Sequence, residues 1–470
     1  MKKLFLFAMA AGLVMGATGC AKDGGDGPNG AGNEGPARMG ISFRLPSEAF
    51  TRVDQPADDV AKFESKINTI QAWVFQGGVA VDDVEGADTN GGGYFTFDIT
   101  DFNPAGAVYT LKDAEAVVTA SGDVTIFVAA NTPAALNKAY DTPAELLAAL
   151  ATVGEMSGTG AFTMCSAAKN ADLTADDGTP GSVNKVSVDL GRVVSKVQAT
   201  TKPAGVAFEN QWTGGPKLTY TVKGYNVHHD ATSSYLVGQA STLSTPIDET
   251  IKPSTLTVHP DAAVGSTLGN LTGGVYIGEN WTDGTNLKGT TTFAMIGTTV
   301  ALDKVAEWNA VDNKVDWVAA PAMPAAEDDV VILTASKGGV DYTFPLIDTN
   351  NLTVESDALS AALTTAGYTV TRLTFWDGWV HFQKWLNKAG SNDYNVGRNQ
   401  FIHLNITGIA QVDGKFPGFP GKDDTNPETP SDPVPDTEED DPVDPLPAEL
   451  LIEVTVKAWE YVANDVVLGE

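Results

Sequence analysis

Alternating apolar and polar positions along the chain predict a protein built mostly from β-strands. Runs with a period of two that are rich in β-branched and aromatic residues are typical of strands with one buried face. The clearest runs in the body of the chain cover residues 67–75, 94–99, 124–129, 183–190, 192–200, 217–227, 255–259, 274–278, 291–302, 330–335, 342–347, 374–385 and 400–406. This series, with few helices, predicts an all-β fold of two β-sandwich domains.

Two short helices are expected between the strands, over residues 142–150 and 356–366. The first begins with Thr142 as its N-cap, a proline at the first helical position and Glu145 as the acidic partner of a capping box. The second is closed by Gly367.

Two further strands lie near the ends of the chain. In the first, every second residue is apolar: Met39, Ile41, Phe43 and Leu45. In the second, the apolar positions are Leu450, Ile452, Val454, Val456 and Ala458, with Trp459 directly after them. An acidic, proline-rich linker of about 30 residues, which reaches roughly 90 Å in an extended conformation, precedes the second strand. We expect this terminal segment to break near Asn464.

An energy comparison leaves two partners open for the terminal strand. Burying about six apolar side chains contributes roughly 1.5–3 kcal/mol each. Ordering about a dozen residues costs roughly 1–2 kcal/mol apiece, so the two terms nearly cancel. The strand therefore needs an edge that also supplies backbone hydrogen bonds, as in strand addition. That edge can belong to another molecule or to the strand's own subunit.

The N-terminus has the pattern of an export signal. Two lysines precede a short apolar run, and the small residues before Cys20 resemble a bacterial lipobox, although Ala17 stands where leucine is usual. We expect Cys20 to be lipidated. Further along, Arg52 and Val53 lie in a polar stretch suited to an exposed loop, where an Arg-specific protease could cut.

Composition narrows the class of protein. The chain has 470 residues and a net charge of −31, which argues against nucleic acid as a partner because phosphate contacts need lysine and arginine. Its second cysteine, Cys165, has no disulfide partner once Cys20 is lipidated, and we expect it to be buried. No cofactor is expected.

Candidate chemistry is sparse, and we expect neither an enzyme nor a metal site. Adjacent His228 and His229 on a strand would point to opposite faces. The acidic run over residues 436–444 lacks the ligand spacing of a calcium loop. Four aromatic residues could form a carbohydrate platform but more often belong to a core: Trp376, Trp379, Phe382 and Trp385.

The chain resembles the Bacteroidales fimbrilin family, in particular the shaft subunit of short (minor) fimbriae. The resemblance covers nearly the whole chain and is most specific in residues 39–52, 192–197, 398–406 and 452–459. It implies two transthyretin-like β-sandwich domains behind a flexible, lipidated N-terminus. It also implies a structural subunit of a cell-surface fimbria that supports adhesion and biofilm formation.

The same resemblance implies how subunits join. The lipoprotein reaches the outer membrane through Cys20, and an Arg-specific surface protease cuts between Arg52 and Val53. The plug strand then leaves, and the donor strand of another subunit replaces it in an extracellular fimbrium. The implied plug residues are Met39, Ile41, Phe43 and Leu45, and the implied donor residues are Ile452, Val454, Val456 and Trp459. The implied partners are further copies, related fimbrial subunits and host or bacterial adhesion ligands.

These inferences divide the chain into six segments, with the boundary between the two domains at Lys202-Pro203-Ala204-Gly205. The segments are a signal peptide at 1–19, a lipidated propeptide at 20–52, an N-terminal domain at 53–203, a C-terminal domain at 204–415, a linker at 416–448 and a donor strand at 449–470. Two alternatives stay open. The chain could be a tip or anchor fimbrial subunit, or a glycan-binding surface lipoprotein that uses the aromatic residues around Trp379.

Overall fold

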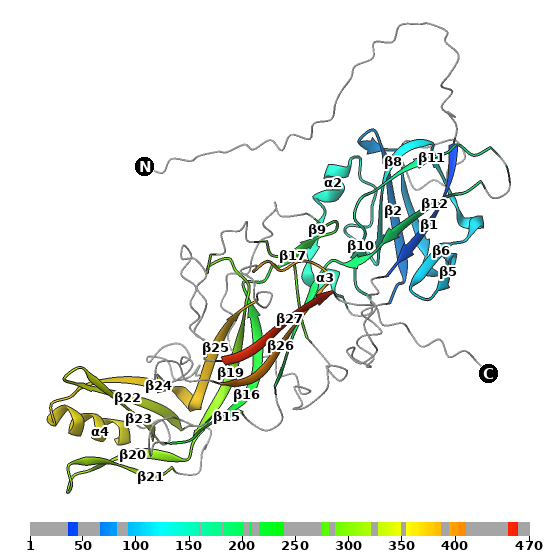
Figure 1. Ribbon diagram of the computed structural model, residues 1–470. Coiled ribbons are helices and arrows are strands. Elements are labelled where there is room, and N and C mark those ends of the chain that lie inside the picture. The colour runs from blue at the N-terminus through cyan, green and yellow to red at the C-terminus, as the bar shows by residue number, and fades with distance from the viewer. Residues whose placement is uncertain are drawn as a thin grey trace, which may run out of the picture.

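The chain forms an elongated molecule of β-sheets, with strand β1 near one end and helix α4 near the other (Figure 1). The computed structural model describes residues 36–45, 66–81, 93–158, 161–177, 179, 182–201, 206–208, 216–238, 274–281, 287–320, 328–348, 354–386, 394–409 and 450–458. Strands dominate these residues and the helices are short, so the prediction of an all-β fold is confirmed.

The first unit is a sandwich of two sheets. One sheet has the order β12 (Asn184–Asp189), β1 (Pro36–Arg44), β6 (Val108–Leu111) and β5 (Phe102–Ala105), and β7 (Val117–Ala120) also pairs with β1. The other has the order β13 (Gly191–Arg192), β10 (Met164–Cys165), β8 (Gly122–Ala130), β2 (Thr69–Gln76) and β3 (Val79–Ala80), with β11 (Lys169–Leu173) on β8 and β4 (Tyr94–Asp98) on β2. Their apolar faces enclose one core.

The second unit is also a sandwich. Its first sheet has the order β18 (Val275–Ile277), β14 (Ser195–Thr201), β26 (Gln400–Ile409) and β27 (Leu450–Ala458). Its second sheet has the order β15 (Val206–Phe208), β16 (Leu218–His228), β19 (Phe293–Leu302) and β25 (Trp379–Trp385). Alternate residues of β14 and β26 pack against those of β16, β19 and β25 in the largest core of this unit.

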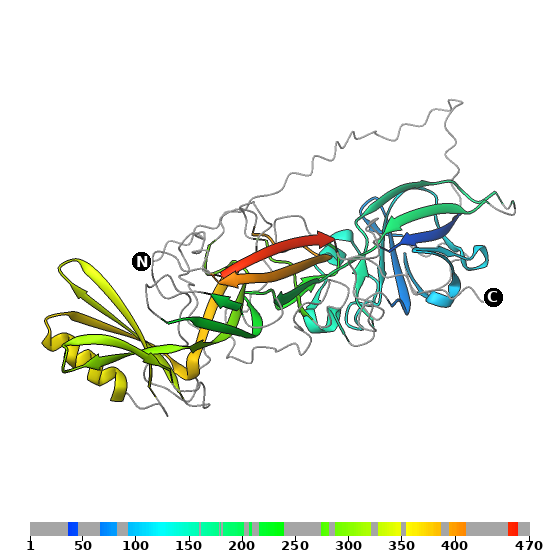
Figure 2. The same cartoon turned by 60° about the horizontal axis from the view of Figure 1, so that its bottom comes forward.

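A third packing unit extends the far end of the second sandwich, and the sequence did not predict it. Helix α4 (Val354–Thr365) packs near a sheet of β23 (Val340–Asp348), β22 (Asp329–Lys337) and β24 (Thr369–Phe375), and a hairpin of β20 (Lys304–Asn309) and β21 (Lys314–Ala319) lies beside them (Figure 2). Leu333 of β22 and Leu359 of α4 share its core. The expected second helix is therefore present, and Gly367 follows it with a φ of +84°.

The two sandwiches are joined by a continuous apolar cluster. It contains Phe162 of the first unit and Leu236 and Tyr276 of the second. Strand β17 (Ser233–Tyr235) also pairs with β9 (Leu150–Thr152), which lies between the short helices α2 (Pro143–Leu147) and α3 (Val153–Met156). Because both a core and a strand pair cross the junction, the sandwiches form one stiff body.

A largely buried ion pair reinforces this junction. The Arg398 guanidinium contacts the Glu279 carboxylate and donates to the carbonyls of Leu236 and Tyr235, at 3.2 and 3.0 Å. A buried charge is tolerated only where partners of this kind satisfy it. The ion pair therefore fixes the entry to β26 against β17 and the residues that follow β18.

Three local predictions need correction. The expected domain boundary places strand 192–200 in the first domain, but β14 pairs with β18 and β26, so the chain enters the second unit at Val193-Val194, before residues 202–205.

Residues 374–385 form two strands in different sheets, because a 3₁₀ turn (Trp376–Gly378) intervenes, with Asp377 and Gly378 at positive φ. Glu145 accepts from the Asp141 amide rather than completing a capping box at Thr142. The expected strand 255–259 lies outside the described residues.

Candidate functional site

Strand β1 occupies an interior position of its sheet and is paired along both edges. On one edge it runs parallel to β12, with Met39 opposite Asn184 and Arg44 opposite Asp189. On the other edge it runs antiparallel to β7 and then to β6. The amide of Leu45 extends this ladder by donating to the Ala107 carbonyl at 3.0 Å. Removing β1 would therefore leave unpaired backbone groups on strands at both sides.

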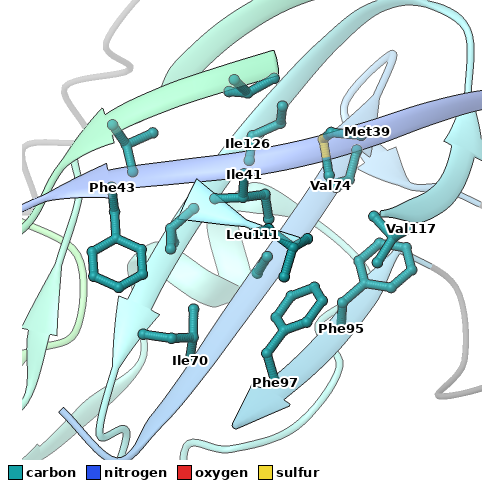
Figure 3. Close-up of a cluster of buried hydrophobic side chains, with 14 of the residues drawn as sticks. Met39, Ile41, Phe43, Ile70, Val74, Phe95, Phe97, Leu111, Val117 and Ile126 are labelled. Carbon is teal, nitrogen blue, oxygen red and sulfur yellow. The ribbon is translucent and has the colours of Figure 1, made fainter. Parts of the chain in front are cut away.

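The predicted plug side chains of β1 point into the sandwich. Met39 and Ile41 have no exposed surface, and Phe43 and Leu45 are 1% exposed. They share one core with side chains of the opposite sheet, such as those of β2 and β8 (Figure 3). The period of two in the sequence thus predicted the buried face of β1.

Phe43 makes the most specific contacts of this buried face. Its ring stacks on Tyr109 with centroids 5.1 Å apart and meets Phe102 edge-on, also at 5.1 Å. Burying four side chains of this kind contributes about 6–12 kcal/mol, at roughly 1.5–3 kcal/mol each. Because that is similar to the whole stability of a typical domain, the first sandwich depends on having a strand in this place.

The outer face of β1 is held by fewer, polar contacts. Arg38 donates to the Asp113 carbonyl at 2.8 Å, and the Asn184 side chain donates to the Arg38 carbonyl at 3.0 Å. Ser42 Oγ lies 2.6 Å from the Oγ of Ser187 on β12. These contacts lie near the surface and therefore contribute little, so the apolar face and the backbone ladder account for most of the binding of β1.

Residues 46–65 connect β1 to β2 and lie outside the described residues. The predicted cleavage site, Arg52 and Val53, falls in this connection, and the predicted lipidation site, Cys20, also lies outside. The described part of the first sandwich thus contains β1 and, after a gap in sequence, the strands that enclose it. A single cut within the gap would separate them covalently.

The terminal strand β27 lies at the edge of its own subunit's second sandwich. It runs antiparallel to β26, with Ala458 opposite Gln400 and Leu450 opposite Ile409 (Figures 1 and 2). This is the within-subunit partner that the energy comparison left open. The donor residues Ile452, Val454 and Val456 belong to β27, whereas Trp459 lies outside the described residues.

The two adjacent histidines belong to a core. The rings of His228 and His229 both pack on Phe293, at 5.1 and 5.0 Å, because a positive φ at His229 turns the chain at the end of β16. The expectation of opposite faces was therefore wrong. In the part of the chain that is described, no three His, Cys, Asp or Glu residues are grouped to hold a metal ion.

The aromatic residues around Trp379 do not form one platform. Phe382 and Trp385 are both buried, in different clusters: Phe382 packs on Tyr220 and Trp385 on Phe293. Trp376 and Trp379 are half-buried. The interpretation of these residues as core and sheet-face packing is favoured.

Cys165 is a buried, free thiol. Burial raises its pKa to about 12, although the charge of Arg398 acts in the opposite direction. The thiol is therefore unreactive at neutral pH.

The acidic run 436–444 lies outside the described residues. None of the described helices has the length and apolarity needed to cross a membrane.

Comparison with known proteins gives likenesses among solved structures only. No family model matches the chain, and no curated protein matches it. A proposed cell adhesion protein from Bacteroides eggerthii has 13% identity and a TM-score of 0.42, covering 92% of this chain and 98% of its own. A second from Parabacteroides distasonis has 15% identity and a TM-score of 0.45, covering 92% and 99%. The C-terminally truncated tip fimbrial protein Mfa3 from Porphyromonas gingivalis has 13% identity and a TM-score of 0.37, covering 90% and 100%.

Sequence reasoning predicted β1 and a strand at residues 183–190, which is β12, but not that the two strands pair. β1 ends at Arg44, and β12 begins at Asn184, 140 residues further along the chain. Its exposed residues Lys185, Ser187 and Asp189 carry no motif. A parallel neighbour so far away in sequence has no local signal, so only the structure could bring these side chains beside β1.

Proposed function

We propose that the protein is a structural subunit of a cell-surface fimbria whose copies join by strand exchange. One observation carries this proposal: β1 fills an interior place in the first sandwich, yet it is joined to the following strand only through the segment that contains Arg52. After cleavage there, β1 is held by non-covalent contacts alone. The terminal strand of another copy then replaces it.

Physical arguments support the exchange. Loss of β1 exposes an apolar cleft and two rows of unpaired backbone groups, which is costly in water. A strand with the same period of two satisfies both, because its alternate residues enter the cleft while its backbone restores the ladder. The terminal segment has that period at residues 450–458. Replacement must accompany departure, since the empty sandwich lacks much of its stability.

The segments of the chain take their roles from this proposal. Residues 1–19 direct export, and Cys20 carries the lipid that holds the precursor at the outer membrane. The propeptide 20–52 leaves after an Arg-specific protease cuts before Val53, and the fimbrium becomes extracellular. The assembled fibre supports adhesion and biofilm formation, and its binding partners are adhesion ligands on host or bacterial cells.

A shaft position fits this chain better than a tip or an anchor. A shaft subunit must both accept and donate a strand, and the chain carries a separable β1 and an apolar terminal strand. It must also transmit force along the fibre. The shared core and the Arg398–Glu279 ion pair make the two sandwiches a stiff rod suited to that task.

Two variants with complementary defects test the proposal. Arg52→Ala keeps its plug and can only donate, whereas a chain truncated before Ala448 can only accept. Each alone should stay monomeric after treatment with an Arg-specific protease, and the mixture should give dimers on unboiled gels but no longer ladder. The control is Lys66→Ala, which removes another basic residue shortly after Arg52 in the sequence, and this variant should polymerise normally. Ladders formed by Arg52→Ala alone would contradict the proposal.

A further inference from the structure

The outer face of β12 presents a fixed order of polar side chains to the strand beside it. Lys185, Ser187 and Asp189 are exposed at alternate positions. Beside Ser187, Ser42 of β1 places its Oγ 2.6 Å away. Beside Asp189, Arg44 places its Nε 4.0 Å from the carboxylate. The order along β12 is therefore positive, neutral, negative.

β1 matches only part of this order. The residue opposite Lys185 is Gly40, which has no side chain with which to meet the ammonium group. The terminal strand carries the complete complement in the same direction and spacing. Its polar positions are Glu453, Thr455 and Lys457, that is, negative, neutral and positive.

We propose that the terminal strand of a second copy runs parallel to β12, with residues 452–457 opposite residues 184–189. This inference rests on the proposed strand exchange and fixes its direction and register. Glu453 then lies opposite Lys185, Thr455 opposite Ser187, and Lys457 opposite Asp189. Ile452, Val454 and Val456 take the inward places of Met39, Ile41 and Phe43.

The polar face decides the register because the apolar face cannot. Every shift by two residues still directs apolar side chains inward, since the period of the strand is two. A shift by two in either direction removes both opposite-charge pairs. Reversing the strand about Thr455 places Glu453 opposite Asp189 and Lys457 opposite Lys185. Like charges directly opposite each other on neighbouring strands are destabilising.

In its own subunit the register of the strand places neither of these charges opposite a charge of the other sign. On β26, Glu453 lies opposite Asn405 and Lys457 lies opposite Phe401. Transfer to β12 of another copy therefore places each charge opposite one of the other sign while the strand keeps a backbone ladder. This difference favours exchange between copies over pairing within one copy.

One position requires a local adjustment. A Cβ added at Gly40 would lie 3.0 Å from Cγ1 of Val183, so Glu453 in that place needs the valine to move by a few tenths of an ångström. Val183 is half-buried and precedes the first residue of β12, so its side chain can turn outward. With that adjustment, Glu453 lies opposite Lys185.

Disulfide trapping in the fibre tests the direction and register. Parallel pairing predicts that both Glu453→Cys with Lys185→Cys and Lys457→Cys with Asp189→Cys give covalent ladders after protease treatment and oxidation. Opposite residues on neighbouring strands lie within the distance that a disulfide can bridge. The crossed pairs, Glu453→Cys with Asp189→Cys and Lys457→Cys with Lys185→Cys, are the matched controls. Cleavage removes Cys20, and Cys165 is buried.

The outcomes separate this inference from the proposed function. Ladders from both parallel pairs and neither crossed pair support it. Ladders from the crossed pairs, or non-covalent polymers in which no pair cross-links, overturn the register but leave strand exchange standing. If the unmodified chain forms no polymer after cleavage, the proposed function fails and this inference fails with it.

Charge reversal gives a second measurement that needs no cross-link. Lys185→Glu should weaken polymer formation by up to about thirtyfold, because the lost charge pair and the like-charge repulsion that replaces it each amount to at most about 1 kcal/mol. Adding Glu453→Lys in the same chain should restore it. Stronger polymer formation by Lys185→Glu alone would instead place Lys457 beside residue 185 and overturn the register.

Discussion

The two sandwiches have equivalent places for a strand and fill them differently. In the first unit β1 lies between a parallel neighbour, β12, and antiparallel neighbours, β6 and β7. In the second, β14 lies between a parallel neighbour, β26, and an antiparallel one, β18. Both sandwiches therefore need a strand that runs parallel to a partner from much later in the chain.

The covalent connection distinguishes the two places. β14 follows β13 after Val193 and Val194, which are fully buried, so a protease cannot reach the backbone there without unfolding the unit. β1 is connected through residues 46–65, which include Arg52. With the proposed cleavage at Arg52, one fold would carry a permanent strand in one sandwich and a separable strand in the other. That difference is what would allow the first sandwich to accept a strand from another subunit.

Removing whole strands should have the largest effects. A chain that begins at Val53 lacks β1, and its first sandwich should fail to fold as an isolated subunit, because about 6–12 kcal/mol of side-chain burial is lost. A chain truncated before Ala448 loses only an edge strand and should stay folded. Near-ultraviolet circular dichroism and limited proteolysis would compare the two. A stably folded first sandwich in the chain from Val53 would break the comparison.

Single core substitutions should distinguish the precursor from the fibre. Phe43→Ala should destabilise the precursor by about 3–5 kcal/mol, through loss of the ring that packs on Tyr109, but should leave the assembled fibre unchanged because β1 has departed. Leu404→Ala, in the core of the second sandwich, should destabilise both by about 2–5 kcal/mol. Denaturant unfolding of each form measures the difference. A Phe43→Ala fibre weaker than the wild-type fibre would show that β1 remains in place.

The acid response of the third packing unit should be opposite in sign to that of the first sandwich. Burial raises the pKa of Asp329 to about 6, with Asp348 as its cross-strand neighbour. The folded state holds this proton more tightly, so the stability it provides is present at low pH and is lost as pH rises from about 4 through 6. Hydrogen bonds from Thr100 and Thr152 lower the pKa values of Asp98 and Glu155, so their contribution is lost as pH falls.

Asp329→Asn tests this difference. The amide oxygen can still accept from the Asp377 amide, while the charge is removed. We expect the variant to gain on the order of 1–2 kcal/mol at pH 8 and nothing near pH 4. Thermal unfolding across this pH range measures the effect, with Asp98→Asn as the control of opposite sign. An equal gain at both pH values would mean that the proton on Asp329 plays no part.

Local patterns predicted β1, whereas pairing over long distances could not be predicted. The alternation from Met39 to Leu45 fixes both the strand and its buried face, because each depends on neighbouring residues only. The assignment of β14 depends on β26, about 200 residues further along, so the sequence alone places it in the wrong unit. The turn at Asp377-Gly378 had a local signal that the strong aromatic pattern around it concealed.

Treatment of the purified precursor with an Arg-specific protease tests strand exchange most directly. The products are examined by N-terminal sequencing and on unboiled gels. The account predicts a new N-terminus at Val53, release of the fragment that contains β1, and a ladder of polymers. A cut before Val53 that releases β1 without producing polymers, or polymers that retain β1, would contradict it.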